Sequence, residues 1–205
     1  MLLVVGNKNY SSWSLRPWIA MKVLGLPFAE KRIALYRPGS KEEILRYSPA
    51  GKVPILQDGN TVVWDSLAIL EYLAERHPQL WPAHAAARAR ARAISAEMHS
   101  GFPSLRQHMS MNVRKRYPGK GRTPEVLAEI ERIRAIWEQA NGPFLFGHFT
   151  AADAMYAPVV LRFRTYDVDL CEDYRNAMLA LPAMKEWIAA AEIEAESLPQ
   201  FERYG

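Results

Sequence analysis

The chain has 205 residues, of which 49% are hydrophobic and 23% charged, and its formal net charge is +4. This composition is typical of a folded protein and excludes a disordered chain. The only cysteine, Cys171, excludes an internal disulfide and a cysteine-based metal cluster. No apolar run approaches the roughly 20 residues of a membrane span, and the N-terminus does not read as a signal peptide. We expect a soluble, cytoplasmic protein with no metal and no membrane partner.

The positive charge is concentrated in two segments, 88–92 and 114–122. In the first, arginine alternates with alanine, which predicts a solvated helix face. The second contains a proline and two glycines, which predict a loop. No aromatic residues interleave with these charges in the manner of nucleic-acid sites, so we expect no nucleic-acid partner.

The N-terminal residues 2–6 (LLVVG) predict a short buried strand. The following helix has an apolar stripe formed by Leu15, Ile19 and Val23. Because Pro17 is tolerated only in the first turn of a helix, this helix should begin near Ser12 to Ser14. Three serines, Ser11, Ser12 and Ser14, therefore lie where a strand ends and a helix begins, as helix caps or as ligand contacts.

The next elements alternate in type. Residues 28–35 predict a second strand, and Ser40 with Glu43 predicts a capping box for a short helix that Pro49 closes. Two apolar runs, 53–56 and 61–64, flank QDGN and predict a hairpin. Asp65 or Ser66 then caps a helix. The order predicts a mixed four-stranded sheet with helices on its faces.

Strand-like alternation ends after a proline-rich linker, 78–83. A long helix is expected from about 84 to 111, with a possible bend at 101–103. Thr123 precedes Pro124 at a helix start, and Thr150 with Asp153 predicts a capping-box variant. Two shorter helices are expected on either side of Leu181–Pro182. We expect an α/β domain over 1–77 and an all-α domain over 84–205.

Three segments together resemble the glutathione S-transferase family. YSSWSLRPW (10–18) resembles the serine-containing active-site turn of zeta and theta-like classes. SPAGKVPIL (48–56) followed by DSLAILEYL (65–73) is similar to the glutathione-binding signature, and FGHFTAADAMYAPVV (146–160) to the capping-box segment of the helical domain. The resemblance covers nearly the whole chain and implies a bacterial, serine-type enzyme with a thioredoxin-like N-terminal domain and an all-α C-terminal domain.

The resemblance assigns Ser11, with Ser12 as the neighbouring candidate, the role of donating a hydrogen bond to the glutathione sulfur. A free thiol has a pKa near 8.5 and attacks as the thiolate, so a donor near the positive end of a helix would favour the reactive form. Serine is not expected to be a nucleophile, and Ser14 is expected to cap the helix.

The resemblance also implies a set of glutathione contacts: Trp13, Lys52, Val53, Pro54, Asp65 and Ser66. A cis bond before Pro54 would turn the Val53 backbone outward to pair with the tripeptide. Ser66 and the helix N-terminus could bind the γ-glutamyl carboxylate, Asp65 the ammonium and Lys52 the glycine carboxylate. The alternatives are that Asp65 and Ser66 only cap their helix, and that Lys52 is a solvated loop residue.

The second substrate is expected between the domains, against the long helix. Candidate residues there, which at helical spacing could equally belong to the core, are Arg16, Met98, Phe102, Arg106 and Met109. Arg16 could assist an anionic substrate or lie on the surface. Cys171 is expected to be a packing residue.

The expected activity is a glutathione transferase that presents the thiolate to an electrophilic small molecule. The first alternative is a glutathione-dependent cis–trans isomerase of the maleylacetoacetate or maleylpyruvate type, although Trp13 stands where the isomerase pattern has cysteine. The second is a non-catalytic binding module of the same fold. The resemblance further implies a homodimer.

Overall fold

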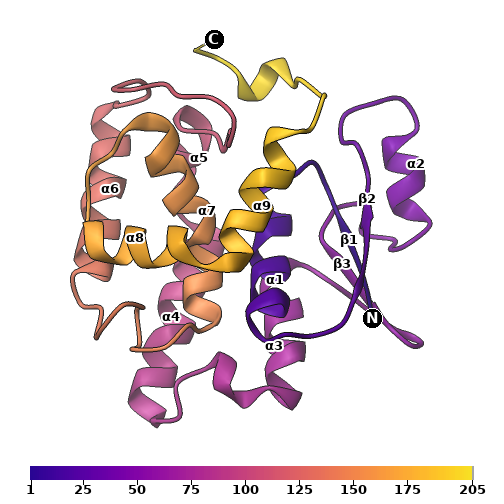
Figure 1. The fold of residues 1–205 in the computed structure, drawn as a ribbon, viewed down its shortest axis with the longest axis horizontal. Coiled ribbons are helices and arrows are strands. Elements are labelled where there is room, and N and C mark those ends of the chain that lie inside the picture. The colour runs from indigo at the N-terminus through magenta and orange to yellow at the C-terminus, as the bar shows by residue number, and fades with distance from the viewer. Residues whose placement is uncertain (205) are drawn as a thin grey trace.

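The computed structural model describes residues 1–204 and begins with a four-stranded sheet in the order β2-β1-β3-β4 (Figure 1). Strand β1 (Leu2–Val5) pairs in parallel with β2 (Ala29–Arg32) and antiparallel with β3 (Ile55–Asp58). Strand β4 (Thr61–Trp64) completes the hairpin with β3. The parallel pair requires a crossover, which α1 (Ser12–Val23) provides. The predicted mixed sheet is confirmed.

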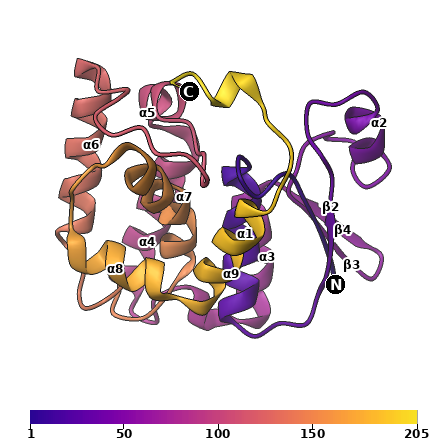
Figure 2. The same cartoon turned by 45° about the horizontal axis from the view of Figure 1, so that its top comes forward.

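The two faces of the sheet bury different sets of side chains, because successive residues of a strand point to opposite faces. Leu3 and Val5 of β1 join the main core with α1 and α3 (Ser66–Arg76). Val4 points the other way and packs with Ile44 of α2 (Ser40–Leu45) in a smaller cluster. Figure 2 shows α1 and α3 between the sheet and the helical half, with α2 on the far side.

The second half of the described chain is helical. Its elements are η1 (Pro78–Leu80), α4 (Ala85–Ser100), α5 (Pro103–His108), α6 (Pro124–Trp137), α7 (Ala151–Tyr166), α8 (Glu172–Ala180), α9 (Pro182–Glu192) and η2 (Pro199–Phe201). Helix α7 is central: it packs against α1 and α4, and all its side chains except Arg164 are buried. The main core therefore runs without interruption from the sheet into the helices.

Three predicted helix starts are confirmed. The Asp65 carboxylate accepts from the N–H groups of Leu67 and Ala68 at 2.8 and 3.3 Å. Thr123 caps α6, which begins at Pro124. The buried Asp153 carboxylate accepts from the N–H and hydroxyl of Thr150 at 2.8 and 2.9 Å. Such caps satisfy backbone groups that the helix itself leaves unpaired.

Two local predictions are wrong. Ser40 forms no capping box: its hydroxyl accepts from Arg37 N–H at 2.9 Å and donates to the Ala34 carbonyl at 2.6 Å, closing the loop before α2 instead. The long helix predicted over 84–111 is interrupted rather than bent. Phe102 has a φ of 60°, outside the helical region, so α4 ends at Ser100 and α5 begins only at Pro103.

The strand predicted over 28–35 is shorter than expected. Strand β2 covers Ala29–Arg32 and is an edge strand with mostly exposed side chains. Cys171, with a φ of 45°, precedes α8 and is half-buried against the main core. In residues 1–204, no helix is long and apolar enough to cross a membrane.

Candidate functional site

A cavity of ≈ 1040 Å³ lies between the sheet and the helical half. The sheet side contributes the serine turn after β1, the loop after β2, the segment before β3 and the start of α3. The helical side contributes α4, α5, residues 110–111, α7 and η2. Among the predicted site residues, the cavity is lined by Ser11, Ser12, Trp13, Lys52, Val53, Pro54, Asp65, Ser66 and Arg106.

The serine turn is organised by hydrogen bonds between its own hydroxyl groups. Ser14 is not the helix cap that the sequence predicted. Its Oγ accepts from Gly6 N–H at 3.0 Å, and it lies 2.7 Å from Ser11 Oγ. Ser11 occupies the N-cap position of α1, but its side chain makes no cap hydrogen bond. If Ser14 donates its proton to Ser11, the Ser11 proton is available to a ligand, and the chain of bonds is cooperative.

The segment before β3 presents backbone groups to the cavity. The Val53–Pro54 peptide bond is cis, as the resemblance implied. Among residues 1–204, neither the N–H nor the C=O of Val53 has a hydrogen-bond partner. An extended peptide could pair with these two groups. Lys52 is exposed at the rim of the cavity.

Asp65 and Ser66 lie where β4 passes into α3. Asp65 has a φ of 77° and a ψ of 134°, a backbone conformation outside the left-handed helical region that residues other than glycine rarely adopt. One of its carboxylate oxygens caps α3, and the other lies 3.2 Å from Nε2 of His99. Ser66 is buried, and its Oγ accepts from Nη1 of Arg16 at 3.3 Å. This corner combines a carboxylate with the positive end of a helix.

Three arginines gather beside the serine turn. Arg106 and Arg162 line the cavity, while Arg16 lies fully buried behind it. Arg162 donates to the Met109 carbonyl and, over 3.4 Å, to Ser12 Oγ. The Trp13 ring lies 4.2 Å from the Arg16 guanidinium carbon and 4.9 Å from that of Arg106, distances that allow cation–π attraction.

Carboxylates act on these arginines only from beyond ion-pair distance within the described chain, Asp65 on Arg16 and Glu129 on Arg106. Among residues 1–204, none of the three forms an ion pair, and all of them donate to hydroxyl or carbonyl oxygens. Burial, together with repulsion from Arg106, lowers the pKa of Arg162 to about 9. Burial also lowers the pKa of Arg16 and Arg106. Arg162, with a pKa of about 9, is charged at neutral pH, so this wall of the cavity favours an anion.

Three residues proposed for the second-substrate pocket lie elsewhere. Met98, Phe102 and Met109 are buried in the main core and do not line the cavity. Their apolar character fits the helical core because α4 and α5 use those faces to pack. Arg16, expected near the substrate or on the surface, is instead enclosed.

Other cavity residues escaped the sequence analysis, among them Arg162, His99 and Phe201. Arg162 had a signal that could have revealed it, because it is a charged residue inside the apolar run of α7, where the burial of an unpaired charge is costly. Phe201 had none. It reaches the cavity from the C-terminal segment, where it stacks on Tyr10 at 5.6 Å.

Residues 1–204 contain no group of three or more His, Cys, Asp or Glu side chains placed to hold a metal ion. The groups that line the cavity are hydroxyls, backbone amides and carbonyls, a carboxylate and guanidiniums. These suit a ligand with peptide character at one end of the cavity and anionic character near the arginines.

Three features define the class of the glutathione transferases. They are a thioredoxin-like sheet domain, an all-helical domain, and a serine at the N-terminus of α1 that faces the cavity between the two domains. The chain belongs to the glutathione S-transferase family. Residues 10–76 match the model "Glutathione S-transferase, N-terminal domain", and residues 85–190 match "Glutathione S-transferase, C-terminal domain".

Relatives in sequence include maleylacetoacetate isomerases, and solved structures of the glutathione transferase fold superpose on the chain. A probable maleylacetoacetate isomerase of Caenorhabditis elegans is 29% identical over 80% of this chain and 78% of that protein. A maleyl pyruvate isomerase, described as a bacterial zeta-class glutathione S-transferase, superposes with a TM-score of 0.73 at 23% identity over 96% and 100% of the two chains. A glutathione transferase homologue from Burkholderia with bound glutathione gives 0.70 at 21% identity over 94% and 98%.

Proposed function

We propose that the protein is a glutathione-dependent isomerase that converts a small anionic cis-enone into its trans isomer. The observation that carries this proposal is the pair Arg106 and Arg162 beside the serine turn, two cavity-lining cations that form no ion pair with a carboxylate of residues 1–204. Conjugation of a general electrophile, the activity favoured by the sequence, needs no such anion site. The zeta-class isomerases among the relatives support the same choice.

Glutathione fits the residues that line the cavity. The Val53 backbone groups, which have no hydrogen-bond partner among residues 1–204, match the amide and carbonyl of its cysteine. Asp65 with Ser66 matches its charged γ-glutamyl end. Lys41 and Lys52, both exposed at the rim, are available for the glycine carboxylate. We propose these glutathione contacts together with the roles of Ser11 and Ser12 that the resemblance implies.

Glutathione would supply a thiolate that adds reversibly to the enone carbon and leaves again after rotation about the resulting single bond. The Ser11 hydroxyl donates a hydrogen bond to the sulfur, and the N-terminal end of α1 adds positive potential, so the thiol ionises more readily. Arg106 and Arg162 hold the carboxylates of the substrate and balance the negative charge that develops on its carbonyl oxygen. The serine remains a hydrogen-bond donor throughout.

The test is turnover of a cis-enone dicarboxylate, with maleylpyruvate as the probe, in the presence and absence of glutathione. We expect isomerisation only with glutathione and slow or no conjugation of a neutral aromatic electrophile. Rapid conjugation without isomerisation would return the assignment to a general transferase. Binding of glutathione without either reaction would favour the non-catalytic module.

The homodimer and the cytoplasmic location also remain predictions. Val62 and Trp64, on the outer strand β4, are 36% and 48% exposed, and apolar groups on an edge strand favour association. Sedimentation equilibrium would measure the mass of the protein in solution and so decide between a monomer of 23.3 kDa and a dimer.

A further inference from the structure

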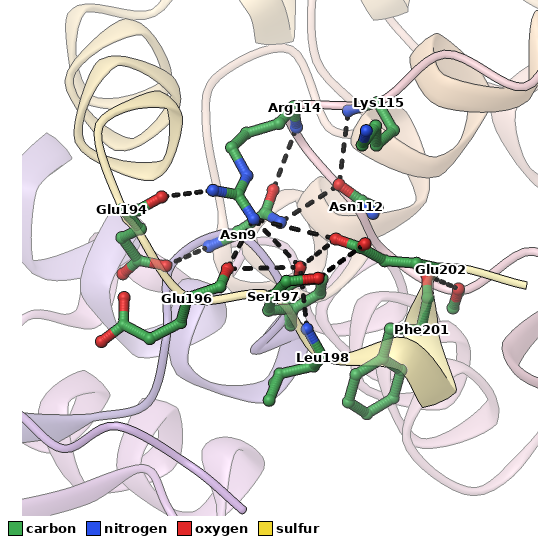
Figure 3. A network of polar contacts seen from close by, with 12 residues as sticks. Asn9, Asn112, Arg114, Lys115, Glu194, Glu196, Ser197, Leu198, Phe201 and Glu202 are labelled. Atoms are coloured by element: carbon green, nitrogen blue, oxygen red, sulfur yellow. Dashed lines mark hydrogen bonds and ion pairs between the residues drawn. The ribbon is translucent and has the colours of Figure 1, made fainter. Parts of the chain in front are cut away.

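The turn that leads into Ser11 is attached to the C-terminal segment of the chain. The carboxylate of Glu194, which follows α9, accepts from Lys8 N–H at 2.7 Å and from Asn9 N–H at 3.1 Å. Its side chain is only 6% exposed. Figure 3 shows this carboxylate beside Asn9. Hydrogen bonds from backbone N–H groups to a buried carboxylate are among the stronger ones in proteins.

The same turn determines the position of the Ser11 backbone. The Asn7 carbonyl accepts from the N–H groups of Tyr10 and Ser11, at 3.1 and 2.8 Å. The Lys8 and Asn9 amides that lie between these residues point away from Ser11 and toward Glu194. Without an acceptor there, two buried donors would be unpaired, which favours another turn conformation.

Further contacts hold the carboxylate in place. The Arg114 guanidinium donates to the backbone carbonyls of Glu194 and Glu196, the second at 2.6 Å, as Figure 3 shows. Arg32 of β2 lies 3.6 Å from the Glu194 carboxylate. Burial raises the pKa of Glu194, whereas its two backbone hydrogen bonds and Arg32 oppose the rise. Glu194 does not line the cavity, so any effect on a bound ligand must pass through the turn.

We propose that Glu194 is a positioning residue for Ser11: by holding the Lys8 and Asn9 amides, it keeps the Ser11 hydroxyl where it can donate to the glutathione sulfur. This inference rests on the proposed function. It explains why a segment 185 residues away in sequence carries a buried acid at this point. The C-terminal segment thus helps to position the serine that binds the thiol.

The experiment compares Glu194→Ala and Glu194→Gln with the matched control Glu196→Gln. Glu196 belongs to the same segment, but its carboxylate contacts Arg32 at 2.9 Å and not the turn. Three quantities are measured: amide hydrogen exchange at Lys8 and Asn9 in the free protein, glutathione affinity, and the pKa of the bound thiol by thiolate absorbance.

In Glu194→Ala we expect faster exchange at both amides and a bound-thiol pKa raised by about one unit, which is a tenfold loss of thiolate at pH below that pKa. Glutathione affinity should stay unchanged at such a low pH, where glutathione binds as the thiol, and should fall at higher pH by linkage. Glu194→Gln keeps one acceptor oxygen and should fall between Glu194→Ala and the wild type. Glu196→Gln should behave as the wild type. If Glu194→Ala does not fold, the comparison of Glu194→Gln with Glu196→Gln decides.

Two results would overturn the inference and identify what failed. If the wild type lowers the thiol pKa and both Glu194 variants lower it equally, Glu194 does not position Ser11, while the proposed function stands. If the wild type binds glutathione with an unshifted thiol pKa, the proposed function fails and the inference with it.

Discussion

Nη2 of Arg162 lies 3.4 Å from Oγ of Ser12, so a guanidinium carried by α7 touches the serine turn 150 residues earlier in the chain. This contact joins the two chemical tasks of the cavity, stabilisation of a sulfur anion and binding of an anionic substrate. The central position of α7 makes it possible, because the helix packs directly against α1.

Ser11→Ala should raise the pKa of bound glutathione toward that of the free thiol. A hydrogen bond to a charged group contributes about 1.5–3 kcal/mol, so we expect a rise of about 1–2 units and a ~10- to 100-fold lower kcat at neutral pH. Thiolate absorbance titrated against pH measures the shift. Ser12→Ala is the comparison. A larger shift in that variant would transfer the role from Ser11 to Ser12.

Arg162→Met should weaken binding of the anionic substrate without weakening the fold. We expect KM for a dicarboxylate enone to rise ~10- to 100-fold, since a charged hydrogen bond is lost. The free protein should keep its Tm, because relief of repulsion from Arg106 offsets the lost bond to the Met109 carbonyl. Steady-state kinetics and thermal unfolding give the two values. An unchanged KM would remove Arg162 from the substrate site.

Two substitutions separate the two roles of Asp65, which are to cap α3 and to bind glutathione. Asp65→Asn keeps an oxygen to cap α3, so stability should hold while glutathione affinity falls with the lost charge. Asp65→Ala should in addition destabilise the protein by roughly 1 kcal/mol. Urea unfolding and calorimetric titration with glutathione provide the measurements. Equal affinity in Asp65→Asn and the wild type would leave Asp65 as a cap alone.

Asp153 should make the free energy of unfolding depend on pH. Burial raises its pKa from 3.8 to about 6, so the folded state binds a proton that the unfolded state releases between about pH 6 and pH 4. Stability from this group therefore increases as the pH falls through 6, by about 1 kcal/mol at pH 5 relative to pH 7.5. Denaturant unfolding of the wild type and of Asp153→Asn, each at about pH 5 and pH 7.5, measures the contribution of this carboxyl group to the free energy of unfolding. The opposite sign would show that the capping bonds to Thr150 outweigh burial.

The sequence was sufficient for the order of the elements and for those parts of the site that are local in the chain. Ser11 and Ser12 lie at the start of α1, directly before its apolar stripe, although Pro17 lies inside this helix and not in its first turn as the sequence predicted. Asp65 caps α3 because a hairpin ends directly before it. Such features depend on propensities and on hydrogen bonds between residues a few positions apart, which a linear pattern can indicate.

The tertiary structure alone decided which side chains reach the serine turn and which are buried in the core. Arg162, Phe201 and Glu194 reach the serine turn from three distant segments, and no local rule relates them to it. Met98 and Met109 have the apolar character of pocket residues, but the packing of α4 and α5 turns them into the core. The sequence by itself determined the fold, the position of the serine turn and the caps at Asp65, Thr123 and Thr150. The charged wall of the cavity and the anchor of the turn come from long-range packing, because burial and charge pairing depend on which helices meet.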